Sequence, residues 1–228
     1  RSTLFPYTTL FRSRTGPSCV TKVRGELGKK LAEICPGDLN KAFFTLCGAS
    51  SIDNGIKLAR LYTGRHKILT RYQSYHGASY GAISASGDPR RIPVDAQQAP
   101  NFVHFDLPYL YRWEYGEENL LKESVASLER VIAYEGPGNI AAILLEGESG
   151  SSGCLKYPVG YLKKVREICN KHGILLIIDE VMSGFGRTGK WFGFEHHDII
   201  PDMIAMAKGL TSAGSRSEER RVGKECRS

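Results

Sequence analysis

The stretch that decides the fold is Ile174-Leu175-Leu176-Ile177-Ile178-Asp179, a continuous apolar run closed by a single carboxylate. A second run of the same kind, residues 203–207 (MIAMA), is closed by Lys208. Short apolar runs flanked by helix-breaking residues are typical of strands buried on both faces of a parallel sheet. Ligands of open α/β sheets bind in the crevice at the carboxyl ends of the strands. We therefore expect Asp179 and Lys208 to lie at the ligand-binding edge of one sheet.

An amine and a carboxylate at such an edge match the chemical needs of pyridoxal 5'-phosphate. The aldehyde of this cofactor forms a Schiff base with a lysine, and its ring nitrogen needs an acidic partner. In return, a pyridinium nitrogen supplies the positive partner that a buried carboxylate requires. Asp179 taken alone could simply cap the next turn, so the prediction of pyridoxal phosphate rests on the joint placement of Asp179 and Lys208.

The rest of the chain alternates strand-like and helix-like segments, which predicts an α/β domain with a mostly parallel sheet and helices on both faces. We expect strands at residues 42–45, 67–71, 140–146, 174–178 and 203–207. Apolar spacing predicts helices within residues 23–34, from residue 51 to about 62, and within 121–132 and 162–168. Residues 88–100 are rich in Pro, Asp and Gln and predict a loop.

The two ends of the chain do not follow this pattern. Residues 1–13 (RSTLFPYTTLFRS) and 214–228 resemble translated sequencing-library adapter, so we expect non-native tails around a body at residues 14–213. Basic disordered tails are the alternative. Each tail carries a formal charge of +2, which leaves +3 of the total +7 for the body. Because the basic excess lies largely in these tails, we expect no nucleic-acid partner.

Composition bounds the class of protein further. No apolar run approaches the length of a membrane span, and no charged-then-apolar leader is present, so we expect no membrane partner. The 6 cysteines are scattered, with no CxxC pair and no metal-ligand spacing. This spacing predicts no metal site. Scattered cysteines in an α/β enzyme are usually reduced thiols, which predicts a cytoplasmic protein without disulfides.

Two further motifs bear on cofactor binding. Gly48-Ala49-Ser50 lies between a predicted strand and a predicted helix, where free N–H groups and the helix dipole favour a phosphate. Ser50 followed by Asp53 is also an ordinary capping box. Tyr75-His76-Gly77 follows the predicted strand at 67–71, where a tyrosine can stack on a flat ring and a glycine permits close backbone approach. Tyr75 could equally be a packing aromatic.

The loop Gly184–Lys190 (GFGRTGK) matches both GxGxxG and GxxxxGK and therefore suggests a nucleotide site. A phosphate-binding P-loop needs Ser or Thr at the next position, where this chain has Trp191. The dinucleotide motif needs a helix that opens at the loop, but residues 191–194 (WFGF) are aromatic and broken by glycine. A nucleotide-binding ATPase is thus a less favoured alternative.

Taken together, residues 48–51 (GASS), 75–77 (YHG), 179–189 (DEVMSGFGRTG) and 207–210 (AKGL) resemble the class III pyridoxal-phosphate-dependent aminotransferases. The resemblance covers residues 14–213. It implies the large domain of a fold-type I enzyme, and a homodimer with active sites at the subunit interface. It also implies a longer parent chain, with an N-terminal segment and a C-terminal small domain that this fragment lacks.

The resemblance assigns roles by motif position. Lys208 would bind the cofactor aldehyde as an aldimine and shuttle a proton, and Asp179 would hold the ring nitrogen protonated. Tyr75 and Val181 would pack on the two faces of the ring. Lys208 and Asp179 are the implied catalytic pair. The residues implied to contact the cofactor are Gly48, Ala49, Ser50, Tyr75, His76, Glu146, Asp179, Val181, Met182 and Lys208.

Two departures from the family pattern bear on the substrate. Met182 stands where many members carry Gln, and Ser151 stands where ornithine- and 4-aminobutyrate-type members often carry Glu. Both resemble the ω-amino-acid or taurine:pyruvate branch. We therefore expect a transaminase that moves an amino group between an amine or ω-amino acid and a 2-oxo acid such as pyruvate. The alternatives are an inactive truncated fragment, or a racemase or aminomutase that uses the same cofactor.

Overall fold

The computed structural model describes residues 21–109, 111, 113 and 116–211. The predicted tails at residues 1–13 and 214–228 lie outside the described residues. The chain divides into two compact units, residues 1–43 and residues 44–228.

The first unit contributes one described helix, α2 (Lys22–Ile34). Its apolar spacing predicted a helix here, and the structure confirms it. The helix begins at the N-cap Thr21, whose side-chain oxygen accepts a hydrogen bond from the backbone N–H of Arg24 at 3.4 Å.

The second unit is built on a five-stranded sheet with the order β2-β1-β3-β4-β5. Every pairing among these strands is parallel. The three inner strands, β1, β3 and β4, are largely buried, because helices cover both faces of the sheet. The predicted α/β fold with a parallel sheet is therefore confirmed. The strands are β1 (Lys67–Arg71), β2 (Phe102–Phe105), β3 (Ile140–Glu146), β4 (Leu175–Asp179) and β5 (Met203–Ala205).

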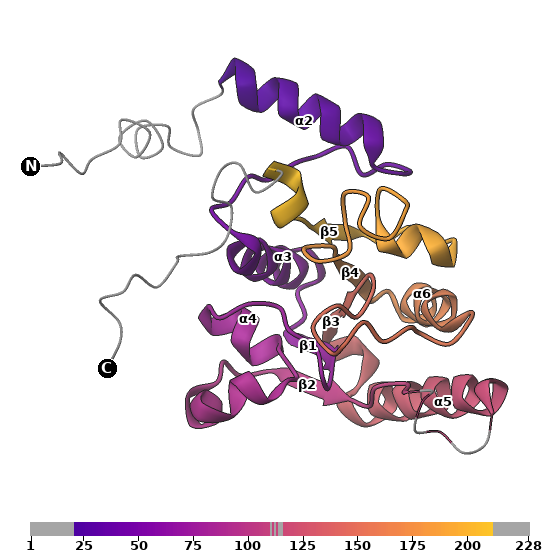
Figure 1. The fold of residues 1–228 in the computed structure, drawn as a ribbon. Helices are drawn as coiled ribbons and strands as arrows, with labels where there is room; N and C mark the ends of the chain where they lie inside the picture. Colours follow the sequence, from indigo (N-terminus) through magenta and orange to yellow (C-terminus); the bar gives the residue numbers. More distant parts are fainter. Residues whose placement is uncertain (1–20, 110, 112, 114–115, 212–228) are drawn as a thin grey trace, which may run out of the picture. The chain divides into compact units, whose positions relative to one another are not determined.

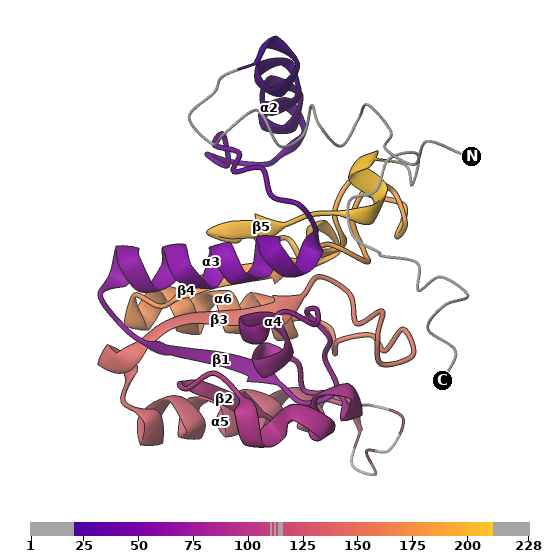
Figure 2. The ribbon, with the colours of Figure 1, turned by 90° about the vertical axis from the view of Figure 1, so that its left-hand side faces the viewer.

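Two helices lie on each side of this sheet (Figure 1, Figure 2). One face carries α3 (Gly48–Thr63) and α4 (Tyr80–Ala85), and the other carries α5 (Glu117–Glu135) and α6 (Tyr161–His172). Ile52 and Ile56 of α3 pack against β1, β3 and β4 in a common apolar core. Short 3-10 segments complete the described chain: η1 (Pro89–Gln97), η3 (Pro137–Asn139), η4 (Gly193–His197) and η5 (Lys208–Thr211). Within the described ranges, no helix is long and apolar enough to cross a membrane.

The strand order creates a switch point between β1 and β3, because the chain first adds β2 on one side of β1 and then returns to add β3 on the other. Such a point is where parallel sheets bind ligands. The register places Glu146 at the end of β3 directly beside Asp179 at the end of β4. Asp179 in turn lies beside Ala205 of β5, three residues before Lys208. The carboxyl ends of β1, β3, β4 and β5 therefore form one edge.

Three predictions of local structure were wrong. Residues 42–45 form no strand, because no described strand pairs with them and the Phe43 side chain is exposed. The helix predicted from residue 51 begins at Gly48, with Cys47 rather than Ser50 as its N-cap. The loop predicted at 88–100 contains η1. Strand β2 and helix α4 were not predicted, since four and six residues carry too little periodic signal.

Candidate active site

The amino end of α3 opens at the switch-point edge and presents Gly48, Ala49 and Ser50. The first N–H groups of a helix have no acceptor within it, and the helix dipole makes them attractive to an anion. The Ser50 N–H already donates to the Cys47 sulfur at 3.4 Å. A phosphate would therefore meet the N–H groups of Gly48 and Ala49 and the Ser50 hydroxyl. The capping-box alternative was wrong, since Asp53 instead accepts from the N–H of Ala82 in α4 at 2.9 Å.

Glycines let three segments close on this helix end. A Cβ on Gly48 would lie 3.1 Å from both methyl carbons of Val181 and 3.5 Å from Ala207, beside Lys208. A Cβ on Gly77 would lie 2.4 Å from the Cβ of Ala49. The predicted YHG, DEV and AKG segments therefore meet the predicted phosphate cradle in space.

Asp179 is buried and both of its carboxylate oxygens are engaged. Oδ1 accepts the N–H of Val181 at 2.9 Å, and Oδ2 lies 2.8 Å from Nδ1 of His76. His76 is itself buried, with its Nε2 3.5 Å from the Thr70 hydroxyl. The two residues come from different strand ends and form a pair. His76, predicted to contact a cofactor, thus orients Asp179 directly.

Lys208 is half-buried just past β5, and its backbone φ of 33° lies in the left-handed region that favours glycine. A non-glycine residue in that region stores strain, and such strain concentrates at functional sites. Within the described part of the chain, no acceptor binds the Lys208 amine. Gly209 follows, and a Cβ there would lie 2.7 Å from Phe185, so the loop at 184–190 packs directly on the lysine turn.

Tyr75 lies after β1 with one ring face already covered. The guanidinium carbon of Arg90 lies 3.6 Å from the centroid of the Tyr75 ring, a cation–π contact that the sequence did not reveal. Arg90 is oriented by Asp88, which accepts a hydrogen bond from its Nε at 2.6 Å. One face of Tyr75 is therefore occupied, and only the other can stack on a flat ring.

Glu146 is bound by a completely buried arginine that the sequence analysis missed. Nη2 of Arg71 lies 2.5 Å from Oε2 of Glu146 and 2.6 Å from the Ser149 hydroxyl, and its Nε lies 3.2 Å from the Tyr157 hydroxyl. Burial opposes the charged form of Arg71, but Tyr157 and Glu146 raise its pKa above the ordinary value. The other oxygen of Glu146 accepts from the Ser151 hydroxyl at 2.7 Å.

The GFGRTGK loop folds back on itself. Its N–H groups at Phe185 and Gly186 donate to the carbonyls of Trp191 and Lys190 at 2.6 Å and 3.2 Å. These donors are therefore unavailable for a nucleotide phosphate, and the segment that follows is the short 3-10 turn η4 rather than an α-helix. Both observations argue against the nucleotide-binding alternative.

Glu180, next to Asp179, anchors the segment after this loop. Its carboxylate accepts from the Ser183 hydroxyl at 2.6 Å and from the N–H groups of Gly193 and Phe194 at 2.9 Å and 3.0 Å. Burial raises the Glu180 pKa, and these hydrogen bonds oppose that rise. Glu180 thus holds the loop in place, with both of its carboxylate oxygens engaged by the protein.

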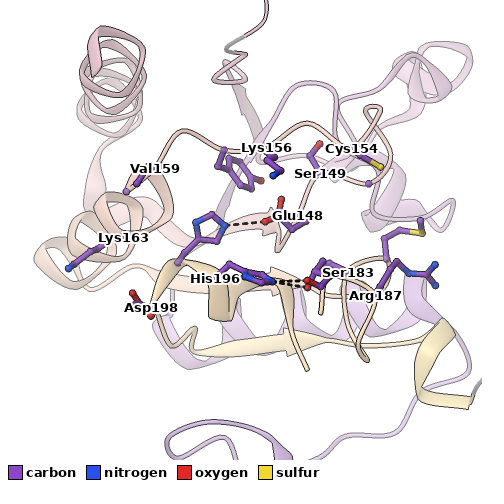
Figure 3. Close-up of a pocket in the computed structure, with 16 residues that line it drawn as sticks. Glu148, Ser149, Cys154, Lys156, Val159, Lys163, Ser183, Arg187, His196 and Asp198 are labelled. Atoms are coloured by element: carbon purple, nitrogen blue, oxygen red, sulfur yellow. Dashed lines mark hydrogen bonds and ion pairs between the residues drawn. The ribbon is translucent and has the colours of Figure 1, made fainter. Parts of the chain in front are cut away.

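A cavity of about 710 Å³ adjoins this edge on the side of α6 (Figure 3). Ser149, Gly150 and Met182 form one wall. Glu148 and His197, whose Oε1 and Nε2 lie 3.4 Å apart, form another. Its lining includes neither Lys208 nor Asp179. The cavity is therefore a neighbour of the predicted site rather than the site itself.

Comparison with known proteins decides the family. The aminotransferase class-III family model matches residues 17–219. The chain belongs to this family. Class-III aminotransferases use pyridoxal phosphate, so the family and the cofactor inferred from the Asp179–Lys208 pair agree.

Two curated relatives resemble the chain over about four fifths of its length. It is 37% identical over 194 residues to taurine–pyruvate aminotransferase of Bilophila wadsworthia, covering 82% of this chain and 42% of that protein. It is 37% identical over 190 residues to leucine/methionine racemase of Thermococcus litoralis, covering 81% of this chain and 42% of that protein. The chain thus spans less than half the length of these relatives.

The fold comparison agrees. The structure of taurine:2-oxoglutarate aminotransferase from Bifidobacterium kashiwanohense, in complex with PLP and glutamate, superposes with a TM-score of 0.84 at 40% identity, covering 91% of this chain and 48% of that one. The fold-type I prediction is confirmed.

The residues present fit pyridoxal phosphate. The open helix end at Gly48 suits a phosphate, and the unengaged amine of Lys208 suits an aldehyde. The buried Asp179–His76 pair suits a protonated ring nitrogen, and the free face of Tyr75 suits a flat ring. No other described segment offers these four features at one edge.

Proposed function

We propose that the protein transfers an amino group between an amine or ω-amino acid and a 2-oxo acid of the pyruvate type, using pyridoxal phosphate. The observation that carries the proposal is the convergence of Asp179 and Lys208 at adjacent strand ends, beside the open amino end of α3. The likeness to taurine aminotransferases supports an ω-amino donor, as do Met182 and Ser151.

The proposed roles follow from the contacts of each residue. Gly48, Ala49 and Ser50 bind the phosphate, Tyr75 and Val181 flank the ring, and Asp179 holds a proton on the ring nitrogen. The Lys208 amine binds the cofactor and moves the proton at the reacting carbon. The bound cofactor supplies the electron sink that makes this proton transfer possible.

Replacement of the lysine tests the proposal. Lys208→Ala is expected to abolish both the visible absorbance of the lysine-bound cofactor and amino transfer to pyruvate. Lys190→Ala is the matched control, because Lys190 lies in the neighbouring loop and donates only to the Glu195 carbonyl, at 2.8 Å. The ATPase alternative predicts the reverse, with ATP binding lost in Lys190→Ala. Unchanged absorbance and turnover in Lys208→Ala would exclude the proposal.

A racemase is the second candidate function, favoured by the likeness to leucine/methionine racemase. A racemase needs no amino acceptor. Incubation of each enantiomer of leucine and of alanine with the loaded protein, with and without pyruvate, separates the two. Change of handedness without pyruvate supports a racemase, and alanine formation from taurine plus pyruvate supports the transaminase.

We also propose that the protein acts as a homodimer in the cytoplasm. Among the described residues, Cys47, Cys154 and Cys169 are free thiols, which suits a reducing compartment. Light scattering on the cofactor-loaded protein tests the dimer, and fractionation of the source cells tests the location.

A further inference from the structure

Two carboxylates end neighbouring strands in direct register at this site, Glu146 on β3 and Asp179 on β4. Adjacent strands lie about 4.8 Å apart, and register partners point to the same face of a sheet. Buried carboxylates this close compete for one proton unless each has its own positive partner. The structure pairs each carboxylate with a different side chain, His76 for Asp179 and Arg71 for Glu146.

Arg71 is suited to hold the Glu146 side chain in one orientation. Its side chain is 0% exposed, so the ion pair is shielded from water and salt. Its guanidinium also donates to the Ser149 hydroxyl and, through Nη1, to the carbonyls of Tyr72 and Gln73, both at 3.4 Å. These contacts tie the end of β1 to the chain that follows β3.

Glu146 passes this orientation on to two parts of the proposed site. Its Oε1 accepts the backbone N–H of Tyr75 at 3.4 Å and the hydroxyl of Ser151 at 2.7 Å. Tyr75 is the proposed ring-stacking residue. Ser151 is the position that distinguishes this chain from ornithine-type members. One arginine thus controls the carboxylate that fixes both the ring side and the substrate side.

We propose that Arg71 is a positioning residue of the cofactor site: as the counter-charge of Glu146 it directs that carboxylate at Tyr75 and Ser151, and so leaves Asp179 as the carboxylate that serves the ring nitrogen. The inference rests on the proposed function only where it names the cofactor. The charged and titratable groups that face Glu146 are Arg71 of β1, Asp179 of β4 with its partner His76, Tyr157 of the following loop, and Arg90 above Tyr75.

The first test needs no cofactor. In Arg71→Met, the unpaired Glu146 takes up a proton in the folded state that it lacks in the unfolded chain, because a buried carboxyl without a cation favours its neutral form. The stability of this variant relative to wild type then falls as the pH rises above about 4.3, the ordinary Glu value. One extra bound proton changes the unfolding equilibrium constant about tenfold per pH unit.

Three further variants make this test specific. Arg71→Met/Glu146→Gln and Arg71→Lys are expected to follow the wild-type pH dependence between about pH 5 and about pH 7, a range that lies wholly above the ordinary Glu value. Arg65→Met is the matched control. Arg65 precedes the same strand and binds only carbonyls at the opposite edge of the sheet, among them those of Ile140 and Gly173 at 3.1 Å and 2.9 Å. It is expected to destabilise the protein equally at every pH.

A pH dependence in Arg71→Met that matches wild type would overturn the inference. If Arg71→Met does not fold, the double variant decides: recovery of folding by Glu146→Gln supports the inference, and failure to recover refutes it.

The second test uses the cofactor-loaded protein. In Arg71→Met, the visible absorbance and circular dichroism of bound pyridoxal phosphate are expected to gain a pH transition that is absent from wild type, Arg65→Met and the Glu146→Gln double variant. A purely structural role for Arg71 would lower stability without adding this Glu146-dependent transition. If wild type binds no cofactor, the proposed function fails, while the unfolding measurements still decide the role of Arg71.

Discussion

Gly77 offers the sharpest test of how the site is assembled, and we expect Gly77→Ala to separate the YHG segment from the phosphate cradle. The Gly77 φ of 133° is a conformation that L side chains rarely adopt, and a Cβ there would lie 2.4 Å and 2.9 Å from the Cβ and Cα of Ala49. Backbone strain of this kind costs about 1–3 kcal/mol, and overpacking costs about 1–3 kcal/mol more. The expected loss of unfolding free energy is therefore about 2–6 kcal/mol.

Urea unfolding of the variant and titration with pyridoxal phosphate measure the two consequences. Gly153→Ala is the matched control, because Gly153 also has a positive φ, 94°, but nothing lies within 4 Å of its Cβ position. It isolates backbone strain at about 1–3 kcal/mol. If the movement of Ala49 removes about 1.4 kcal/mol of phosphate-binding free energy, the affinity for the cofactor falls about tenfold. A Gly77→Ala cost no larger than that of Gly153→Ala would refute the close apposition of the two segments.

Three other predictions follow from burial. Because burial raises the Glu180 pKa, the stability advantage of wild type over Glu180→Gln should be largest below the ordinary Glu value and should shrink as the pH rises through the raised pKa, as pH-dependent urea unfolding will show. Burial raises the Cys169 pKa to about 12, so its thiol should react slowly at pH 8. Titration with a thiol reagent should therefore count one fewer fast-reacting thiol in Cys154→Ser than in wild type, and an unchanged number in Cys169→Ser. Leu144→Ala in the centre of the sheet should cost about 2–5 kcal/mol in the same unfolding assay, whereas Val159→Ala, at 82% exposure, should change stability by less than about 0.5 kcal/mol; equal costs would contradict the assigned core.

The parts of the fold that the sequence predicted are those where one physical signal dominates. Strands β3, β4 and β5 lie in continuous apolar runs, so the apolar residues alone identified them. The polar residue that closes β4 marked the ligand edge. Helices α5 and α6 show apolar spacing over 19 and 12 residues, long enough for the period to be clear.

The parts that the sequence did not predict depend on contacts between distant segments. Arg71 looks like the polar end of a short strand, and only its pairing with Glu146, 75 residues later, makes it part of the site. Arg90 lies in a segment predicted as loop, and its stacking on Tyr75 has no local signature. Phe43 and Phe44 have strong strand propensity, but propensity forms a strand only where a neighbour supplies hydrogen bonds.

Arg65, just before β1, and Arg71, the last residue of β1, affect how the protein folds. Arg71 finds its carboxylate 75 residues later, and Arg65 finds its last carbonyl 108 residues later. Strand β1 is the first of the five described strands along the chain and lies inside the sheet, so Arg65 and Arg71 lack these partners until β3 and the end of α6 have formed. Contacts of such long sequence separation slow folding, because loop closure costs entropy before the contacts form. On the ribosome, β1 is therefore expected to stay open until residue 173 has left the exit tunnel, and to close in one late step.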